Sequence, residues 1–197
     1  MKKLKGLVGC LFVVVFISWL FSCQHELKLS AVSYAEFEQF IQETGYVTDA
    51  ERYGWSIVQL DVYNYTKVDS ANWRKPDGQH APASKDLPVT QISYNDAMAY
   101  CAWAKTRLPS YEEYWDLIKA DKRQVVSDNL LPISPVEQYN VLGNVWDVTS
   151  TKKGKPVRLA GGSVFCSPNT CHGTVKEREL FVDQETGNIH IGFAVVR

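Results

Sequence analysis

The stretch Ser93–Asp116 reads SYNDAMAYCAWAKTRLPSYEEYWD and carries the strongest helical signals of the chain. Ser93 with Asp96, and Ser110 with Glu113, have the spacing of capping boxes. In a capping box a hydroxyl and a carboxylate bond the free amides at a helix N-terminus. The proline of the intervening RLP disfavours helix in the residue before it. The stretch therefore predicts two helices separated by a short break.

The residues on either side add one more helix and some short strands. Ser33 and Glu36 form a third capping-box pattern at the start of SYAEFEQFIQETGY. Residues 47–88 are aromatic and irregular, which predicts one or two short strands, the best at Ile57–Val62, and a long loop with Trp73 packed inside it. IHIGFAVVR near the C-terminus predicts a final strand. Helices, short strands and much loop together indicate an α+β fold.

Length and composition are those of one globular domain with a sizeable core. The chain has 197 residues, of which 6 are Trp, 10 Tyr and 8 Phe, and these side chains bring much apolar area to a core. The formal net charge is −1, and no stripe of Lys and Arg is visible. Nucleic acid is therefore not expected as a partner.

The N-terminal stretch MKKLKGLVGCLFVVVFISWLFSC predicts an export signal rather than part of the fold. Its apolar run, Leu7–Phe21, is shorter than the roughly 20 residues of a spanning helix and fits a secretory signal better. LFSC, at Leu20–Cys23, is similar to the cleavage box of bacterial lipoproteins, although a plain uncleaved anchor is the alternative. We therefore expect a cell-envelope lipoprotein, periplasmic or on the surface, tethered to the membrane by its lipid. The predicted parts are a signal peptide (1–22), a tether from lipidated Cys23 (23–30) and one domain (31–197).

Three cysteines remain outside this N-terminal stretch, namely Cys101, Cys166 and Cys171. An odd number in an exported protein leaves at least one thiol without an internal partner. Cys101 is expected to be a buried free thiol on its helix. Cys166 and Cys171 lie in the loop GGSVFCSPNTC, and in an exported protein this spacing by itself favours a disulfide, although two thiols are also soft ligands suited to copper(I).

Several phrases, in order, resemble the formylglycine-generating enzymes and their relatives. These phrases are TGYVTDAERYGWS, NWRKPDG, PVTQISYNDAMAYCAWAKTRLPSYEEYWD, LGNVWDVTS, AGGSVFC and IGFAVV. The resemblance covers residues 31–197 and implies a loop-rich variant of the C-type-lectin-like fold. It also implies an activity, the oxidation of a cysteine thiol in a protein or peptide substrate, such as a sulfatase, with O2 and copper(I).

The resemblance assigns roles to the Gly-Gly-Ser loop. Cys166 and Cys171 would hold copper(I) between two thiolates, and Ser163 beside them would orient oxygen. These three are the expected catalytic residues. His172 follows directly and would at most adjust this site.

A structural calcium ion is the second implied cofactor. Its ligands would be the side chains of Asn140 and Asp147 and the main-chain carbonyls of Gly143 and Val145. An all-oxygen set with a carboxylate suits this hard ion. The alternative is a tight glycine-containing turn held by the asparagine. Asp147 is also shorter than the glutamate more usual at this position.

Departures from the family pattern keep other functions open. Ala160 and Ala194 stand where the family has arginines, and Glu179 falls where an arginine of the peptide groove would be. These changes favour a non-catalytic, lectin-like lipoprotein that binds protein or glycan at the cell envelope. An iron-dependent relative would need a histidine cluster, but the histidines show no ligand spacing. They are His25, His80, His172 and His190.

Overall fold

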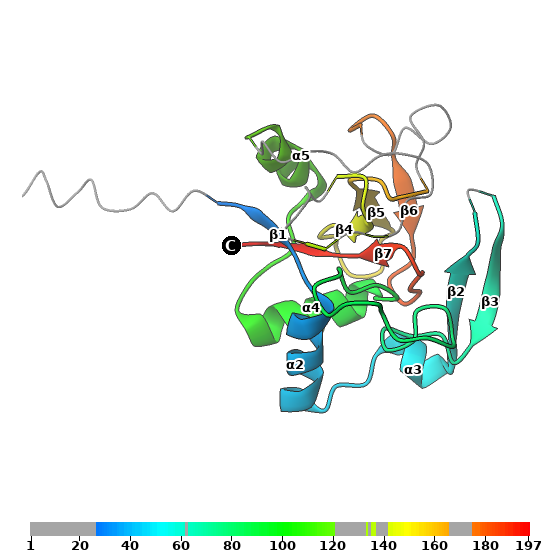
Figure 1. Cartoon of the computed structure of the whole chain (residues 1–197). Helices are drawn as coiled ribbons and strands as arrows, with labels where there is room; N and C mark the ends of the chain where they lie inside the picture. The colour runs from blue at the N-terminus through cyan, green and yellow to red at the C-terminus, as the bar shows by residue number, and fades with distance from the viewer. Residues whose placement is uncertain (1–26, 62, 121–132, 134, 137–141, 166–174) are drawn as a thin grey trace, which may run out of the picture.

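The computed structural model describes residues 27–61, 63–120, 133, 135–136, 142–165 and 175–197 (Figure 1). These residues form short helices and strands joined by ordered loops, as the α+β prediction requires. The helices are α2 (Tyr34–Thr44), α3 (Asp49–Tyr53), α4 (Tyr94–Ala104) and α5 (Tyr111–Ala120). The strands are β1 (Leu29–Ala31), β2 (Trp55–Gln59), β3 (Tyr65–Asp69), β4 (Trp146–Val148), β5 (Val157–Ala160), β6 (Leu180–Val182), β7 (Ile191–Gly192) and β8 (Ala194–Val196).

The three predicted capping boxes are confirmed. The Ser33 hydroxyl accepts the Glu36 amide at 3.2 Å at the start of α2, and α4 begins with the same reciprocal pair. At α5 the Glu113 amide donates to the Ser110 hydroxyl at 3.2 Å. The local sequence therefore determines where these helices begin.

The region between α2 and α4 is more regular than the sequence indicated. Helix α3 begins at a further capping box, and strands β2 and β3 form an antiparallel hairpin that pairs Trp55 with Asp69. The predicted strand Ile57–Val62 begins two residues too late, and the second strand, for which the sequence indicated no position, is β3. β3 is almost wholly exposed, so it lacks the alternation of apolar and polar residues that marks a half-buried strand.

The central sheet has the strand order β6-β5-β4-β7, in which β4 and β7 are parallel. A separate two-stranded sheet pairs β1 with β8, so the two ends of the described chain lie side by side (Figure 1). β1 begins at Leu29, inside the segment predicted as tether. No helix in the described part of the chain is long and apolar enough to cross a membrane.

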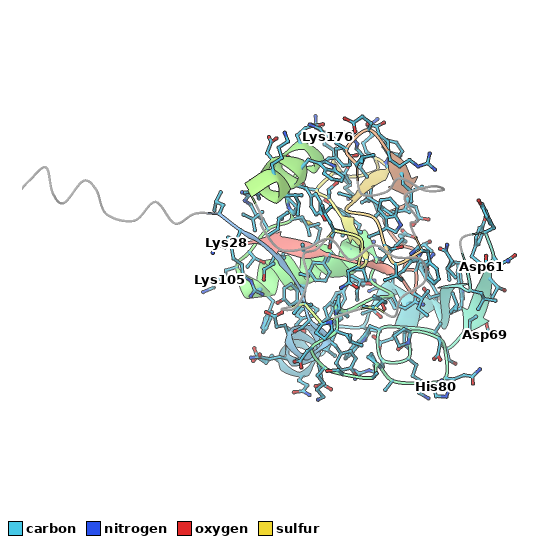
Figure 2. The ribbon with its side chains drawn as sticks, turned by 45° about the horizontal axis from the view of Figure 1, so that its top comes forward. Lys28, Asp61, Asp69, His80, Lys105 and Lys176 are labelled. Atoms are coloured by element: carbon cyan, nitrogen blue, oxygen red, sulfur yellow. The ribbon has the colours of Figure 1, made fainter. Side chains whose placement is uncertain are left out.

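An aromatic core holds the helices against the sheets. Trp73 has no exposed surface, and its ring lies 5.4 Å from that of Phe37, so its predicted packing inside the long loop is confirmed. Tyr100 of α4 packs edge-on against Phe193 at 5.2 Å. Cys101 is a free, buried thiol, as expected, and burial raises its pKa. Charged residues such as Lys28, Asp61 and Lys176 lie at the periphery (Figure 2).

Candidate functional site

A glycine turn after β5 positions the serine of the predicted site. Gly161 and Gly162 have φ angles of 88° and 72°, a left-handed conformation that glycine adopts without steric cost. A Cβ atom on Gly161 would also clash with the hydroxyl of Tyr114. The turn carries the chain inward, so that Ser163 has no exposed surface.

Ser163 is paired with a histidine that the sequence did not single out as a site residue. The hydroxyl oxygen of Ser163 lies 2.6 Å from Nδ1 of His190, and it accepts the amide of Phe165 at 3.3 Å. The His190 carbonyl accepts the Trp146 amide at 2.8 Å, which fixes the histidine against the sheet. Burial lowers the pKa of His190 to about 4, so the imidazole is neutral at pH 7.

His190 lines a cavity of about 600 Å³ between the β2–β3 hairpin and the central sheet. Trp146 and Phe165 lie beside it on the sheet side, and Ile57 and Tyr65 belong to the hairpin side. Phe165 lines this cavity, and Cys166 is the next residue in the sequence. The segment that carries the two cysteines therefore begins at the cavity wall.

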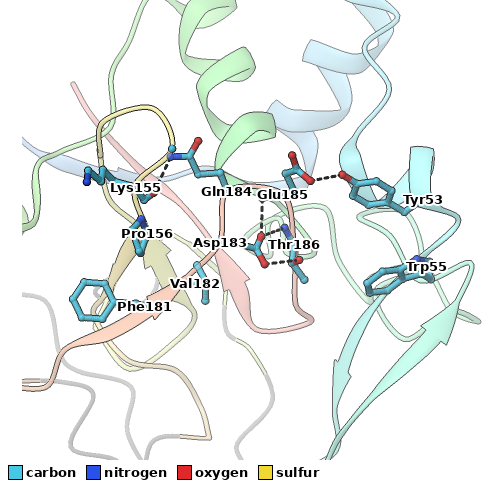
Figure 3. A pocket seen from close by; sticks show the side chains of 11 residues that line it. Tyr53, Trp55, Lys155, Pro156, Phe181, Val182, Asp183, Gln184, Glu185 and Thr186 are labelled. Carbon is cyan, nitrogen blue, oxygen red and sulfur yellow. Dashed lines mark hydrogen bonds between the residues drawn. The ribbon is translucent and has the colours of Figure 1, made fainter.

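A second hollow, of about 850 Å³, continues the first along the edge of β6 (Figure 3). Tyr53 and Trp55 line one side of it and Phe181 of β6 the other, and the Tyr53 hydroxyl donates to Glu185 at 2.6 Å. The two hollows have four lining residues in common, so they form one continuous groove. These are Phe181, Val182, Asp183 and Thr186.

The groove has an arginine at position 178, next to position 179 where the family resemblance placed one. Arg178 lines the 600 Å³ cavity, whereas Glu179 forms an ion pair with Arg158. The Arg158 guanidinium in turn lies 3.7 Å from the centre of the Tyr111 ring. A positive charge is therefore present at the cavity wall although Glu179 stands at the position expected for it.

Asp147 is a fully buried carboxylate on β4. Its Oδ2 accepts the Tyr114 hydroxyl at 3.0 Å, and its Oδ1 has no hydrogen-bond partner among the described residues. Burial raises the pKa of Asp147 to about 8, and the bond from Tyr114 opposes this only in part. A buried carboxylate with an unpartnered oxygen is a hard donor of the kind that calcium requires, so Asp147 fits the predicted ion.

The turn before β4 and the Gly-Gly-Ser loop are bonded directly to each other. The Gly143 amide donates to the Gly161 carbonyl at 2.7 Å, and the Val164 amide donates to the Asn144 carbonyl at 3.1 Å. The structure therefore brings three predicted calcium residues close to Ser163. They are Gly143, Val145 and Asp147.

The remaining predicted site residues lie outside the described part of the chain. They are Cys23, Asn140, Cys166 and Cys171. In the described ranges no group of three or more His, Cys, Asp or Glu side chains could hold a metal ion. Two residues of the site were missed, namely Tyr114 and His190. The only signal for His190 was its place directly before the apolar strand sequence IGFAVV, which does not by itself mark a site.

Residues 24–118 match the family model described as the sulfatase-modifying factor enzyme 1-like domain. The formylglycine-generating enzyme of Thermomonospora curvata is 38% identical over 104 residues, covering 44% of this chain and 34% of that enzyme. Over these residues the chain is similar to the formylglycine-generating enzyme family. The bovine formylglycine-generating enzyme is 29% identical over 215 residues. The alignment covers 72% of this chain and 57% of the bovine enzyme.

Some of the similar proteins are named as inactive enzymes. The "Inactive C-alpha-formylglycine-generating enzyme 2" of Mus musculus is 28% identical over 207 residues, covering 77% of this chain and 66% of the mouse protein. The chain thus spans less than two thirds of the length of the bovine and mouse relatives. Similarity to these proteins does not by itself decide between an active and an inactive protein.

Solved structures confirm the predicted fold. PvdO from Pseudomonas aeruginosa superimposes with a TM-score of 0.62 at 14% identity, covering 85% of this chain and 78% of PvdO. CarF superimposes with a TM-score of 0.50 at 16% identity, over 87% of this chain and 85% of CarF. The fold is the variant of the C-type-lectin-like fold that the formylglycine-generating enzyme family uses.

Proposed function

We propose that the chain is an oxidoreductase of the formylglycine-generating type, which oxidises a cysteine thiol of a protein or peptide with O2. One observation carries this proposal: the Gly-Gly-Ser turn buries Ser163 against His190 and brings the chain to the cavity wall at Phe165, one residue before the cysteine pair. Similarity to the family supports the reaction type, and the family description points to a sulfatase as the substrate protein.

Copper(I) is the proposed cofactor because the donor set is two thiols. Cys166 and Cys171 would hold it, since this soft ion prefers thiolate ligands. When bound, copper would supply the oxygen chemistry. In a balanced equation, one cysteine side chain, one O2 and two further thiols give one aldehyde, one hydrogen sulfide, one water and one disulfide.

The described residues contribute the shape and polarity of the site. The groove along β6 is long and open enough for a peptide segment, with aromatic rings on both walls. The Phe165 ring packs edge-on against His190 at the end of the cavity that precedes Cys166. Asp147 would hold the structural calcium together with Asn140 and the carbonyls of Gly143 and Val145, and so fix the turn bonded to the Gly-Gly-Ser loop.

We further propose that the protein acts at the cell envelope, anchored by a lipid on Cys23. The support is the sequence alone: a short apolar run followed by LFSC. A lipid anchor would keep the groove close to the membrane, where exported substrate proteins emerge.

The test is turnover of a thiol peptide. The reduced full-length protein is loaded with copper(I) and incubated in air with a cysteine peptide taken from a sulfatase and with excess thiol. We expect an aldehyde, trapped with a hydrazide and identified by mass, and none with Cys166→Ser or Cys171→Ser. Copper binding without an aldehyde on any sulfatase peptide would refute the oxidase and leave the non-catalytic, lectin-like interpretation.

A further inference from the structure

His190 is one of the polar residues that line the cavity, whereas Ser163 is not among its lining residues. Ser163 has no exposed surface, whereas His190 retains 5% exposure and forms part of the wall. A group that contacts a ligand must be reachable from the space that the ligand occupies. The resemblance assigns the oxygen-orienting role to Ser163. In the structure, however, His190 is the residue of this pair that lies next to the space for a ligand.

The link between the two residues determines which proton the histidine offers. The Ser163 oxygen accepts the Phe165 amide, and the proton of the 2.6 Å contact with Nδ1 can come from either group; donation by the hydroxyl makes Nδ1 the acceptor. A neutral imidazole that accepts at Nδ1 carries its proton on Nε2. Within the part of the chain that the structure describes, no hydrogen-bond partner is assigned to Nε2.

We propose that His190 contacts the ligand in this cavity as a neutral N–H donor at Nε2, directed to the sulfur of a peptidyl cysteine, and that Ser163 is a positioning residue that acts through His190. The choice of a cysteine sulfur rests on the proposed function. The donor role itself rests on the Ser163 contact and the cavity.

The surroundings of His190 suit a donor to sulfur. Trp146, Phe165 and Leu180 give the cavity apolar walls, and a hydrogen bond is stronger there than in water. Arg178 adds a positive charge at the wall, which favours the thiolate form of a bound cysteine. The Phe165 ring meets the imidazole edge-on at 5.1 Å and, with the serine, restricts its rotation.

The competing interpretation is a purely structural histidine that ties the Gly-Gly-Ser loop to the sheet. Such a residue would keep the same hydrogen bond to Ser163 but would not respond to a ligand. A spectroscopic measurement on the imidazole itself separates the two, because it needs neither copper nor turnover.

The experiment uses the full-length, reduced, metal-free protein labelled with 15N in its histidine rings. The probe is the capped tripeptide acetyl-Ala-Cys-Ala-amide, compared with its Ala-Ser-Ala counterpart. His190 is assigned by the loss of its signals in His190→Asn. The control is His80→Asn, because His80 is an exposed histidine at the surface (Figure 2).

We expect a protonated Nε2 and an unprotonated Nδ1 at pH 7, and a shift of the Nε2 signal that only the cysteine peptide causes. Ser163→Ala should leave the ring in place but mix its tautomers and weaken peptide binding about tenfold, and His190→Asn should weaken it at least as much. His80→Asn should bind as the wild type does.

Two results would overturn the inference: a proton on Nδ1 instead of Nε2, or an Nε2 signal that the cysteine peptide leaves unchanged. The expected shift in a protein that forms no aldehyde would uphold the role of His190 and refute the oxidase. The two proposals can therefore fail separately.

Discussion

The hydroxyl of Tyr114 donates to the carboxylate of Asp147 at 3.0 Å, joining α5 to the centre of the four-stranded sheet. This contact satisfies one carboxylate oxygen and leaves the other, Oδ1, without a partner among the described residues. A buried carboxylate in this state is costly to ionise unless a cation is bound beside it. Oδ1 is therefore the atom through which Asp147 would bind the predicted calcium ion.

Calcium should raise the melting temperature of the protein relative to a chelator, because an ion bound only by the folded state stabilises that state. Asp147→Ala should remove this difference. Differential scanning calorimetry with calcium and with chelator checks both. The matched control is Asp116→Ala, an exposed aspartate on α5, which should keep the full calcium response. Equal melting of the wild type in both buffers would contradict the calcium site.

Gly161→Ala should destabilise the fold by about 2–5 kcal/mol, because the left-handed backbone and the clash with the Tyr114 hydroxyl both oppose a Cβ atom. Gly154→Ala is the control, since Gly154 also has a positive φ, of 72°, but has open space around its Cβ position. It should cost only about 1–2 kcal/mol. Urea unfolding of both variants measures the difference. Equal losses would mean that the Tyr114 contact is unimportant.

Asp96 should make stability depend on pH between about 4 and 6. Burial raises its pKa to about 6, although the amides of Ser93 and Asp49 and the Tyr46 hydroxyl all donate to it. A carboxyl group whose pKa is higher in the folded state favours folding when protonated. This contribution to the free energy of unfolding is fully present below the pKa of Asp96 in the unfolded chain, which is about 4. It is lost as the pH rises through the folded-state pKa of about 6.

Asp96→Asn removes the titrating group, so comparison with this variant measures how much Asp96 contributes to the pH dependence of stability. The unfolding free energy of the wild type minus that of the variant should fall as the pH rises from 4 to 6, by at most about 1.4 kcal/mol per pH unit. Urea titrations at several pH values give the two curves. A constant difference over this range would show that Asp96 has the same pKa in the folded and unfolded chains.

Copper(I) should bind to the reduced protein at a single tight site made by Cys166 and Cys171. Either single serine replacement should weaken binding by orders of magnitude, because one thiolate cannot supply the pair of soft ligands. Competition against a coloured copper(I) chelator measures the affinity. Cys101→Ser should bind as the wild type does, since Cys101 is a buried thiol on α4. Unchanged affinity in the Cys166 and Cys171 variants would place the copper elsewhere.

Labelled palmitate should enter the protein in a bacterial host with a lipoprotein pathway, and Cys23→Ala should abolish the labelling. The reason is the LFSC box after a short apolar run. Cys10→Ala serves as the control, because Cys10 lies within the predicted signal peptide. Labelling that survives Cys23→Ala would contradict lipidation at Cys23, and an unlabelled wild type would favour an uncleaved anchor.

The sequence predicted best what depends on neighbours in the chain. Ser93 and Asp96 stand three residues apart, so the sequence alone shows their capping box. The pairing of Ser163 with His190 spans 27 residues and arises only when β5 and β7 join the same sheet as β4. The exposed strand β3 was not located for another reason, since its side chains bury little and show no apolar pattern. The family resemblance located the Gly-Gly-Ser loop, but it did not indicate the histidine beside it.

The pairing of β1 with β8 also constrains when the protein can finish folding. Leu29–Ala31 bonds to residues 194–196, and Lys28 and Arg197 exchange main-chain hydrogen bonds of 2.9 and 3.0 Å. During synthesis β1 emerges early and must wait, unpaired, until residues 194–197 have been made. An exported chain would therefore cross the membrane with this sheet still open, and a chain interrupted before residue 194 would expose an uncompleted edge to chaperones and proteases.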